Sequence, residues 1–297
     1  MTSKINSKTG LRETHHDYYG VPQVNQKSLN MLRLTGQPTA VHSAPIGNGM
    51  TLDFYSTLRA SNELFVVFHG ANTSKNHFYP RFERVHSMQS SVKSFMAFAD
   101  PTIQMGLKQD MWLSWFLGGP SFDPLPLISR VVHKALGRTG AKYVAFVGGS
   151  GGGYAALRAS AAWPGSLAYI QDPQTQIHQY VPSVVSKYFN TVWPGWDSEQ
   201  LMAAFPERFN MVDHYATLQP RNFVYYAQSQ SDTAHVANHF APFAKVHGMD
   251  PVAGMNSAKN RLLALYEGKI SGHAKITASE YALHFSNAIQ FWREGRK

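Results

Sequence analysis

A glycine-flanked serine is the residue of this chain best placed to act as a nucleophile. Ser150 lies in the run GGSGG, residues 148–152, which matches the pattern Gly-x-Ser-x-Gly. An apolar segment, 143–147, precedes this run, and an alanine-rich segment, 154–162, follows it. This context predicts a strand, a sharp turn and a helix, in which only small side chains fit on either side of the serine. We therefore predict that Ser150 is a nucleophile held on a strained turn.

The same glycines could instead form a phosphate-binding loop, but the residues around them argue against it. The run lacks the Lys-Ser/Thr pair of a P-loop, and Tyr154 stands where a Gly-x-Gly-x-x-Gly begun at Gly149 needs its third glycine. The chain contains no cysteine, which excludes a thiolate nucleophile, a disulfide and a thiolate zinc site. It also shows no His-Glu-x-x-His or similar ligand spacing, so we expect neither a metal nor a cofactor.

The elements that must position Ser150 follow a regular alternation. Short apolar runs alternate with helix-length segments, which is typical of a largely parallel sheet with helices on both faces. The run 64–68 is continuously apolar, as expected for a strand buried on both sides. The predicted strands are 50–55, 63–68, 94–99, 143–147, 167–170, 223–227 and 262–266, and the predicted helices are 111–117, 125–136 and 278–293.

With this order of elements, the chain resembles the α/β-hydrolase superfamily over about residues 50–295. The resemblance implies a nucleophile, an acid and a histidine in that chain order. It implies that Asp232, after the strand 223–227, is the acid. Asp172 is the alternative, because some members carry the acid after the preceding strand. The implied histidine is His273, which would take the proton of Ser150 while Asp232 fixes its tautomer.

The resemblance also implies where the oxyanion of the reaction is held. The strand 63–68 leads into His69-Gly70-Ala71-Asn72, which is similar to the His-Gly turn of the superfamily. The backbone N–H groups of Ala71 and Gly151 would form the oxyanion hole. We expect His69 to brace this turn, and we expect Asn72 to contact the substrate.

Residues 172–213 interrupt the alternation with a segment rich in aromatic residues and proline. A cap-like insertion after the sixth strand of the superfamily pattern, here 167–170, would explain this composition, and Trp193 and Trp196 would then enclose the substrate. The alternative is a pair of ordinary packing helices joined by a turn. Both Trp193 and Trp196 are therefore candidate substrate-binding residues.

Composition and charge limit the remaining possibilities. Hydrophobic residues make up 43% of the 297 residues and charged residues 15%, which supplies a core and argues against disorder. We predict an N-terminal arm or irregular segment over 1–37 and one α/β-hydrolase domain over 38–297. The net charge is +9, but the basic residues are scattered and no nucleic-acid-binding motif accompanies them, so no nucleic-acid partner is expected. The polar N-terminus and the absence of a long apolar run predict a cytoplasmic chain without a membrane span.

The α/β-hydrolase resemblance implies cleavage of a carboxylic ester through an acyl-Ser150 intermediate. Two alternatives remain: an acyltransferase that moves an acyl group to or from a carbohydrate or other alcohol, and a non-catalytic binding scaffold. Residues 98–101 (FADP) and 112–118 (WLSWFLG) are also similar to hydrolase-like proteins of bacterial surface-polysaccharide and glycoprotein export. That similarity extends the expected substrates from small-molecule esters to carbohydrate-linked ones. The sequence leaves the oligomeric state open.

Overall fold

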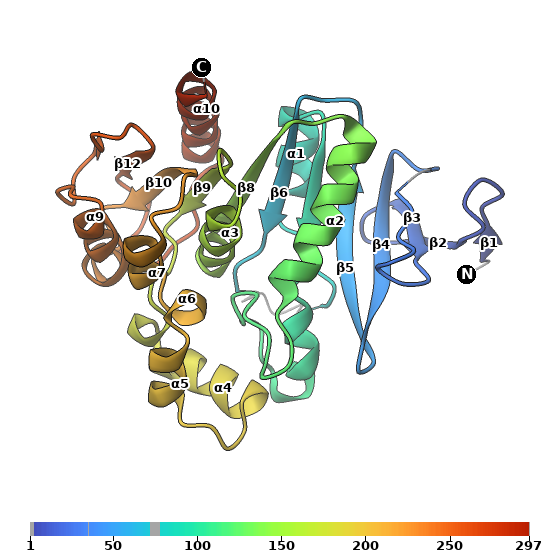
Figure 1. Cartoon of the computed structure of the whole chain (residues 1–297), viewed down its shortest axis with the longest axis horizontal. Coiled ribbons are helices and arrows are strands. Elements are labelled where there is room, and N and C mark those ends of the chain that lie inside the picture. The colour runs from blue at the N-terminus through green and yellow to red at the C-terminus, as the bar shows by residue number, and fades with distance from the viewer. Residues whose placement is uncertain (1–2, 35, 72–77, 297) are drawn as a thin grey trace. The chain divides into compact units, whose positions relative to one another are not determined.

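The computed structural model describes residues 3–34, 36–71 and 78–296. The chain forms two compact units, Met1–Val144 and Ala145–Lys297. One α/β-hydrolase domain over 38–297 stays a prediction. Figure 1 follows the chain through both units. In the described ranges, no helix is both long enough and apolar enough to cross a membrane.

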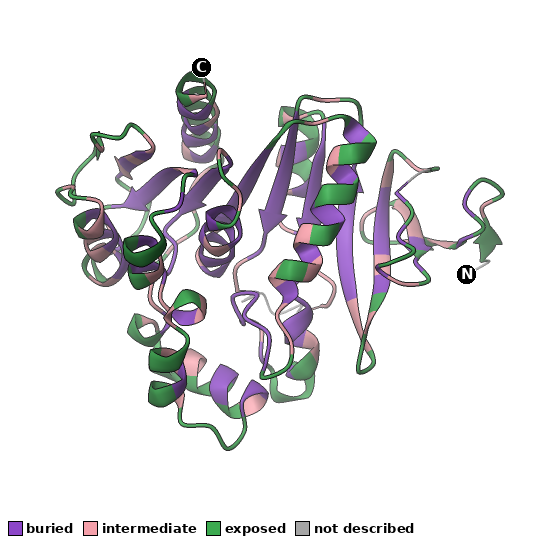
Figure 2. Ribbon diagram, in the orientation of Figure 1, coloured by how far each residue is buried: buried purple, intermediate pink, exposed green. Residues whose placement is uncertain are grey.

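The first unit is built on a mixed sheet whose strands follow the order β1-β2-β3-β4-β5-β7-β6. The pairs β3–β4 and β6–β7 are parallel, and the other pairs are antiparallel. Every residue of β6 and β7 is buried, which places the core of this unit around them (Figure 2). The bounds are β1 Lys4–Ile5, β2 Arg12–His16, β3 Val21–Asn25, β4 Thr39–Gly47, β5 Met50–Thr57, β6 Glu63–Phe68 and β7 Phe95–Phe98.

The segment 1–37, expected as an irregular arm, contributes strands to this sheet. β3 pairs in parallel with β4, and β2 pairs with the other edge of β3. Leu11, Val24 and Ala40 form a small buried cluster that ties these strands together. Most other residues of β2 and β3 are half-buried and the rest are exposed, so the alternation of apolar and polar residues that identifies a strand is weak here.

The helical segments of the first unit are α1 Val85–Ser91, η1 Pro101–Met105, η2 Leu107–Gln109 and α2 Pro124–Thr139. The predicted helix over 125–136 is confirmed by α2. Its first turn is capped by the Asp123 side chain, which accepts a hydrogen bond from the Leu125 N–H, and it ends at Gly140 in a left-handed conformation.

The predicted helix over 111–117 is wrong. Trp115 and Phe116 have φ angles of 50° and 56°, which no right-handed helix contains. The cause is the buried carboxylate of Asp100, whose Oδ2 accepts hydrogen bonds from Ser114 Oγ at 2.7 Å and from the Phe116 N–H at 2.6 Å. This segment therefore wraps around Asp100, and its apolar residues other than Trp112 are buried without forming a helix.

The second unit is built on a sheet in which four neighbouring strands are parallel, as the sequence predicted. The order is β8-β9-β10-β12-β11, and only the short β11 runs antiparallel to its neighbour. The bounds are β8 Tyr143–Gly149, β9 Leu167–Gln171, β10 Phe223–Ser229, β11 Gly254–Met255 and β12 Arg261–Tyr266. Each of β8, β9, β10 and β12 lies on a predicted strand to within two residues at either end.

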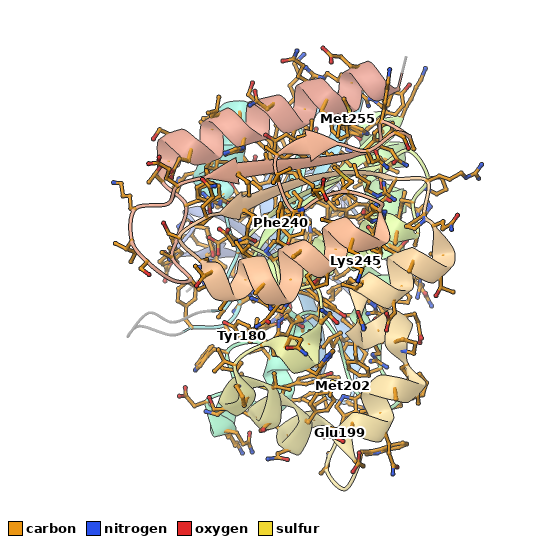
Figure 3. The ribbon with its side chains drawn as sticks, turned by 90° about the vertical axis from the view of Figure 1, so that its left-hand side faces the viewer. Tyr180, Glu199, Met202, Phe240, Lys245 and Met255 are labelled. Atoms are coloured by element: carbon orange, nitrogen blue, oxygen red, sulfur yellow. The ribbon has the colours of Figure 1, made fainter. Side chains whose placement is uncertain are left out.

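Helices cover both faces of the strands of the second unit. Figure 3 shows the strands between α10 on one side and the continuous η4–α9 helix on the other. The helical segments are α3 Gly151–Ala161, η3 Ile177–Gln179, α4 Pro182–Val192, α5 Ser198–Ala204, α6 Pro206–Phe209, α7 Met211–Leu218, α8 Thr233–His235, η4 Val236–Phe240, α9 Ala241–Val246 and α10 Ala278–Gly295. Helix α10 confirms the predicted final helix and begins with a capping box formed by Thr277 and Glu280.

The cap-like insertion consists of the helices α4 to α7, which lie between β9 and β10 in the chain. In Figure 1, α4 and α5 stand apart from the strands β8, β9 and β10, at the bottom of the view. The insertion is therefore a helical addition to the sheet and not a further strand of it.

Candidate active site

The turn between β8 and α3 holds Ser150 in a strained conformation. Its φ and ψ are 52° and −124°, which non-glycine residues rarely adopt. A Cβ atom added to Gly148 would lie 2.1 Å from the carbonyl oxygen of Gly152. The glycines are thus required by the close approach of the two sides of the turn, and the predicted strand, turn and helix are confirmed.

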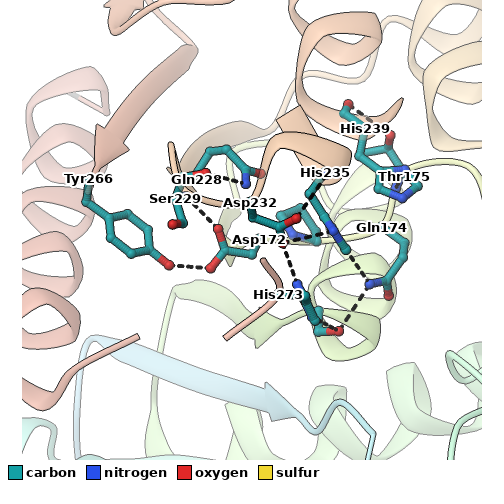
Figure 4. Close-up of polar contacts among 12 residues, drawn as sticks. Asp172, Gln174, Thr175, Gln228, Ser229, Asp232, His235, His239, Tyr266 and His273 are labelled. Carbon is teal, nitrogen blue, oxygen red and sulfur yellow. Dashed lines mark hydrogen bonds and ion pairs between the residues drawn. The ribbon is translucent and has the colours of Figure 1, made fainter. Parts of the chain in front are cut away.

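The three residues predicted as a triad meet in the second unit. Figure 4 labels two of them, Asp232 and His273. Ser150 Oγ donates to His273 Nε2 at 2.9 Å, and His273 Nδ1 donates to Asp232 Oδ2 at 2.8 Å. Ser150 comes from the turn after β8, Asp232 from the loop after β10 and His273 from the loop after β12. The segments that follow three parallel strands therefore bring the three side chains into contact.

Local backbone contacts fix the two loops that carry the acid and the histidine. The Gly272 N–H donates to the carbonyl oxygen of Ser231 at 2.9 Å, directly beside both residues. The Ser231 hydroxyl also donates to the carbonyl oxygen of Glu267. Side-chain exposure is 2% for Asp232 and 31% for His273, so the acid is shielded while the histidine is open to an incoming substrate.

The electrostatics of Asp232 suit its position against two imidazoles. Burial alone would raise its pKa, but hydrogen bonds from His235 and His273 outweigh burial and hold the pKa below its ordinary value. Asp232 is therefore ionised at neutral pH. An ionised carboxylate at this position orients the His273 ring and stabilises the imidazolium that forms when His273 accepts a proton.

Asp172, the alternative acid, is engaged elsewhere. Its Oδ1 accepts a hydrogen bond from the Ser229 N–H at 2.6 Å, and its Oδ2 accepts one from the Tyr266 hydroxyl. Burial raises its pKa to about 6, against the opposing effect of these two donors. Asp172 thus joins the ends of β9, β10 and β12, whereas Asp232 is the carboxylate that contacts His273.

A second histidine, which sequence reasoning did not select, shares the same carboxylate. His235 Nδ1 lies 2.9 Å from Asp232 Oδ2, and the His235 ring stacks on that of His273 with centroids 4.1 Å apart and planes at 8°. Its spacing of three residues from Asp232 at the start of a helix was a signal that could have identified it. The amide nitrogen of Gln174 lies 2.9 Å from His235 Nε2 and 3.1 Å from Ser150 Oγ. No sequence motif indicates Gln174, which reaches the site from the loop after β9.

Asp232, His235 and His273 also have the residue types of a metal site, with ligand atoms within 4.8 Å of one another. A metal ion bound by imidazole lies close to the plane of the ring. Because the two rings are stacked nearly parallel, an ion in the plane of one lies outside the plane of the other. The arrangement therefore fits hydrogen bonding to a shared carboxylate better than metal binding.

The residues predicted for the oxyanion hole belong to different units. Gly151 is the first residue of α3 and is buried, so its N–H lies in the first turn of a helix, where the backbone dipole favours negative charge. Ala71 follows β6 in the first unit, and Asn72 lies outside the described residues. The oxyanion hole stays a prediction.

His69 braces the turn after β6, as predicted. Its Nδ1 donates to the carbonyl oxygen of Gly70 at 2.7 Å, and its Nε2 accepts a hydrogen bond from the Asp100 N–H at 2.9 Å. Burial lowers the pKa of His69, which keeps the ring neutral and lets Nε2 act as an acceptor. The residues 98–101 and 112–118 thus meet at Asp100, next to this turn.

The two tryptophans of the cap-like insertion have different environments. Trp193 is 3% exposed, and its Nε1 donates to the Tyr188 hydroxyl at 2.9 Å. Trp196 is 55% exposed and packs edge-on against Trp193. A role of either residue in binding substrate stays a prediction.

A cavity of about 230 Å³ lies beside the triad in the second unit. Its lining includes Asp232, His235 and His273 together with Tyr180, Val181 and Asn238. The Tyr180 ring lies edge-on to both imidazoles, with centroids 5.9 Å from His235 and 6.5 Å from His273. This is small for a ligand pocket, since pockets for drug-sized molecules occupy roughly 300–1,000 Å³.

Comparison with known proteins identifies the fold. No protein-family model matches the chain, and no curated protein matches its sequence. Among solved structures, it is similar to the capsule O-acetyltransferase of Neisseria meningitidis serogroup A, with a TM-score of 0.56, 14% identity and coverage of 83% of this chain and 96% of that one. It is similar to carboxyl esterase 2 of Tuber melanosporum, with a TM-score of 0.54, 14% identity and coverage of 91% and 90%.

A third similar structure is the glycosylation-associated protein complex Gap123 of Streptococcus agalactiae, with a TM-score of 0.58, 15% identity and coverage of 83% of this chain but 45% of that one. At these identities the similarities establish the arrangement of the chain and not its chemistry. The chain therefore has the α/β-hydrolase fold, with a largely parallel sheet and a helical, cap-like insertion.

Proposed function

We propose that this protein is a serine hydrolase that cleaves a carboxylic ester through an acyl-Ser150 intermediate. The observation that supports the proposal most strongly is the hydrogen-bonded chain from Ser150 Oγ through His273 to Asp232, with donor–acceptor distances of 2.9 and 2.8 Å. The strained turn supports it further, because such a turn presents the serine hydroxyl at the end of a strand.

Each side chain has a defined task in the proposed reaction. Ser150 Oγ attacks the acyl carbon while its proton passes to His273 Nε2, and the electron pair of the carbonyl moves onto its oxygen. The N–H of Gly151 would bind this oxyanion. The intermediate then collapses, and the alcohol leaves with the proton from His273. Water next attacks the acyl-enzyme while its proton passes to His273, and the carboxylic acid is released as Ser150 regains its proton.

A second candidate function is acyl transfer to a carbohydrate or other alcohol. It is favoured by the similarity to a capsule O-acetyltransferase, which extends over 96% of that chain. The exposure of His273 is compatible with it, because the same imidazole can deprotonate an acceptor alcohol in place of water.

An assay with p-nitrophenyl acetate tests the proposal. We expect release of p-nitrophenol by the wild-type protein and a loss of about 10⁶-fold in kcat for Ser150→Ala. Circular dichroism of the variant controls for folding. Product analysis with and without an added sugar alcohol separates the two functions, since only an acyltransferase forms more acetylated sugar than its buffer controls. Equal turnover by wild type and a folded Ser150→Ala would overturn the proposal, and turnover by neither would favour the non-catalytic scaffold.

A further inference from the structure

The triad is one half of a closed ring of hydrogen bonds. Figure 4 labels Asp232, His235, His273 and Gln174 of this ring. One half runs from Ser150 through His273 to Asp232. The other returns from Asp232 through His235 Nδ1 at 2.9 Å, from His235 Nε2 to the Gln174 amide at 2.9 Å, and from that amide to Ser150 Oγ at 3.1 Å. Ser150 Oγ is therefore contacted by both His273 and Gln174, and each of these is connected to the Asp232 carboxylate by hydrogen bonds.

The direction of each hydrogen bond follows from the chemistry of the groups. Both imidazoles use Nδ1 to donate to the ionised Asp232, so both present an unprotonated Nε2. Ser150 gives its only proton to His273. The Gln174 amide must then donate one N–H to His235 and the other to Ser150 Oγ. With the amide reversed, its oxygen would face the lone pair of His235 Nε2, so the nitrogen assignment is the one that satisfies every partner.

Burial and backbone contacts hold this second half of the ring in place. Gln174 is 0% exposed and His235 is 5% exposed. The loop carrying Gln174 is tied to η4, because the Thr175 N–H donates to His239 Nδ1 and the Thr175 hydroxyl donates to the His239 carbonyl oxygen. Burial lowers the pKa of His235, which keeps its Nε2 available as an acceptor at neutral pH.

We propose that Gln174 is a further catalytic residue, whose amide N–H holds Ser150 Oγ in the orientation for attack, and that His235 is the residue that positions this amide. The inference rests on the proposed function of Ser150. It differs from the role of the oxyanion hole, because the donor contacts the attacking oxygen itself in the resting protein.

The amide moves no proton in this scheme. As Ser150 Oγ bonds to the acyl carbon, its proton goes to His273 Nε2 and the carbonyl electron pair goes to the carbonyl oxygen. Gln174 keeps both of its N–H groups throughout. The amide dipole favours negative charge on Oγ while the proton departs, and it restricts the Ser150 rotamer to one that faces His273.

Gln174→Met is the direct test, because methionine matches the length of glutamine but donates no hydrogen bond. The measurement is the second-order rate constant for labelling of Ser150 by a fluorophosphonate, together with kcat and KM for p-nitrophenyl acetate. We expect the labelling rate and kcat to fall by about 100-fold, as for loss of one donor in an active site, with KM little changed. The melting temperature shows separately whether the substitution destabilises the fold.

Two substitutions of His235 form a matched pair. In His235→Asn, the amide can reproduce the Nδ1 contact with Asp232 but not the contact with Gln174. In His235→Gln, the longer side chain can reproduce the contact with Gln174 but not the one with Asp232. If His235 acts by positioning Gln174, His235→Gln keeps a higher Ser150 labelling rate than His235→Asn. The double variant Gln174→Met, His235→Asn then has the same labelling rate as Gln174→Met alone.

The outcomes separate this inference from the proposed function. A wild-type chain that takes no label at Ser150 would overturn both. A labelled wild type with a folded Gln174→Met that reacts at the same rate would overturn the role of Gln174 alone. Equal reactivity of the two His235 variants, with losses that add to that of Gln174→Met, would show that His235 does not act through the amide.

Discussion

The rings of His235 and His273 lie stacked, with centroids 4.1 Å apart and planes at 8°, and both contact Oδ2 of Asp232. The two nitrogen atoms of the His273 ring contact Asp232 and Ser150. One carboxylate therefore aligns the proton acceptor of the nucleophile and also the histidine that contacts Gln174.

Replacing Asp232 should cost far more activity than replacing Asp172. Asp232→Asn removes the charge that fixes the His273 tautomer, so we expect kcat to fall by about 10⁴-fold. Asp172→Asn should lose much less, because the contacts of Asp172 lie with Ser229 and Tyr266. Steady-state kinetics of both folded variants decide the point, and the reverse ranking would make Asp172 the acid.

The glycine two residues before the nucleophile should tolerate no side chain. In Gly148→Ala the added Cβ would meet backbone atoms of Gly152 at 2.1 Å, so the turn must open and Ser150 must move. We expect a lower melting temperature together with loss of Ser150 labelling.

Gly137→Ala is the matched control for this substitution. Gly137 lies within α2, and nothing stands within 4 Å of its added Cβ. This variant should gain up to about 1 kcal/mol of stability, because alanine favours the helix. A Gly148→Ala protein that reacts and melts like Gly137→Ala would contradict the strained-turn account.

The two tryptophans of the insertion should respond differently to truncation. Trp193→Ala removes a buried ring and should destabilise the fold by about 3–5 kcal/mol. Trp196→Ala, at an exposed position, should leave the melting temperature nearly unchanged. If Trp196 encloses substrate, its loss raises KM for a bulky ester much more than for an acetyl ester. An equal change in KM for both esters, relative to wild type, would end the assignment of Trp196 as a substrate-binding residue.

Acid should destabilise the protein through its buried histidines. Burial lowers the pKa of His42 to about 3, and burial together with nearby positive charge does the same for His239 and His247. The unfolded chain binds protons at these groups below about pH 6.5, while the folded chain does not until about pH 3. Stability therefore falls as the pH drops through this window, by up to about 1.4 kcal/mol per pH unit for each histidine.

His42→Asn isolates one of these contributions, because the asparagine oxygen can keep the hydrogen bond that His42 Nδ1 accepts from Gln26. Urea unfolding at several pH values between 4 and 8 should show a shallower decline for the variant than for wild type. Parallel curves would mean that His42 does not titrate in this way.

The sequence was sufficient to predict the central elements because their signals are local. The continuous apolar run of β6 and the glycine run around Ser150 each encode a conformation within a few residues. The loop 111–117 could not be predicted, because its backbone follows the carboxylate of Asp100, more than ten residues earlier in the chain. Strands β2 and β3 were missed because they are mostly half-exposed and carry little hydrophobic pattern.

The residues of the candidate site could likewise be predicted from the sequence only in part. Chain order was enough to select Ser150, Asp232 and His273, which the structure brings together. Gln174 could not be selected, because its role depends on the position of one amide between two distant side chains. Side-chain contacts across three loops are set by the folded structure and leave no pattern of spacing in a single sequence.

The most direct test of the central claim is the mass of the protein during turnover. We expect wild-type protein mixed with p-nitrophenyl acetate and quenched in acid within the first turnover to carry one acetyl group, located by peptide mapping on Ser150. The Ser150→Ala protein should carry none at that position, and His273→Ala should acquire it far more slowly. Steady ester turnover with no acetyl group on Ser150 at any quench time would contradict the acyl-Ser150 mechanism.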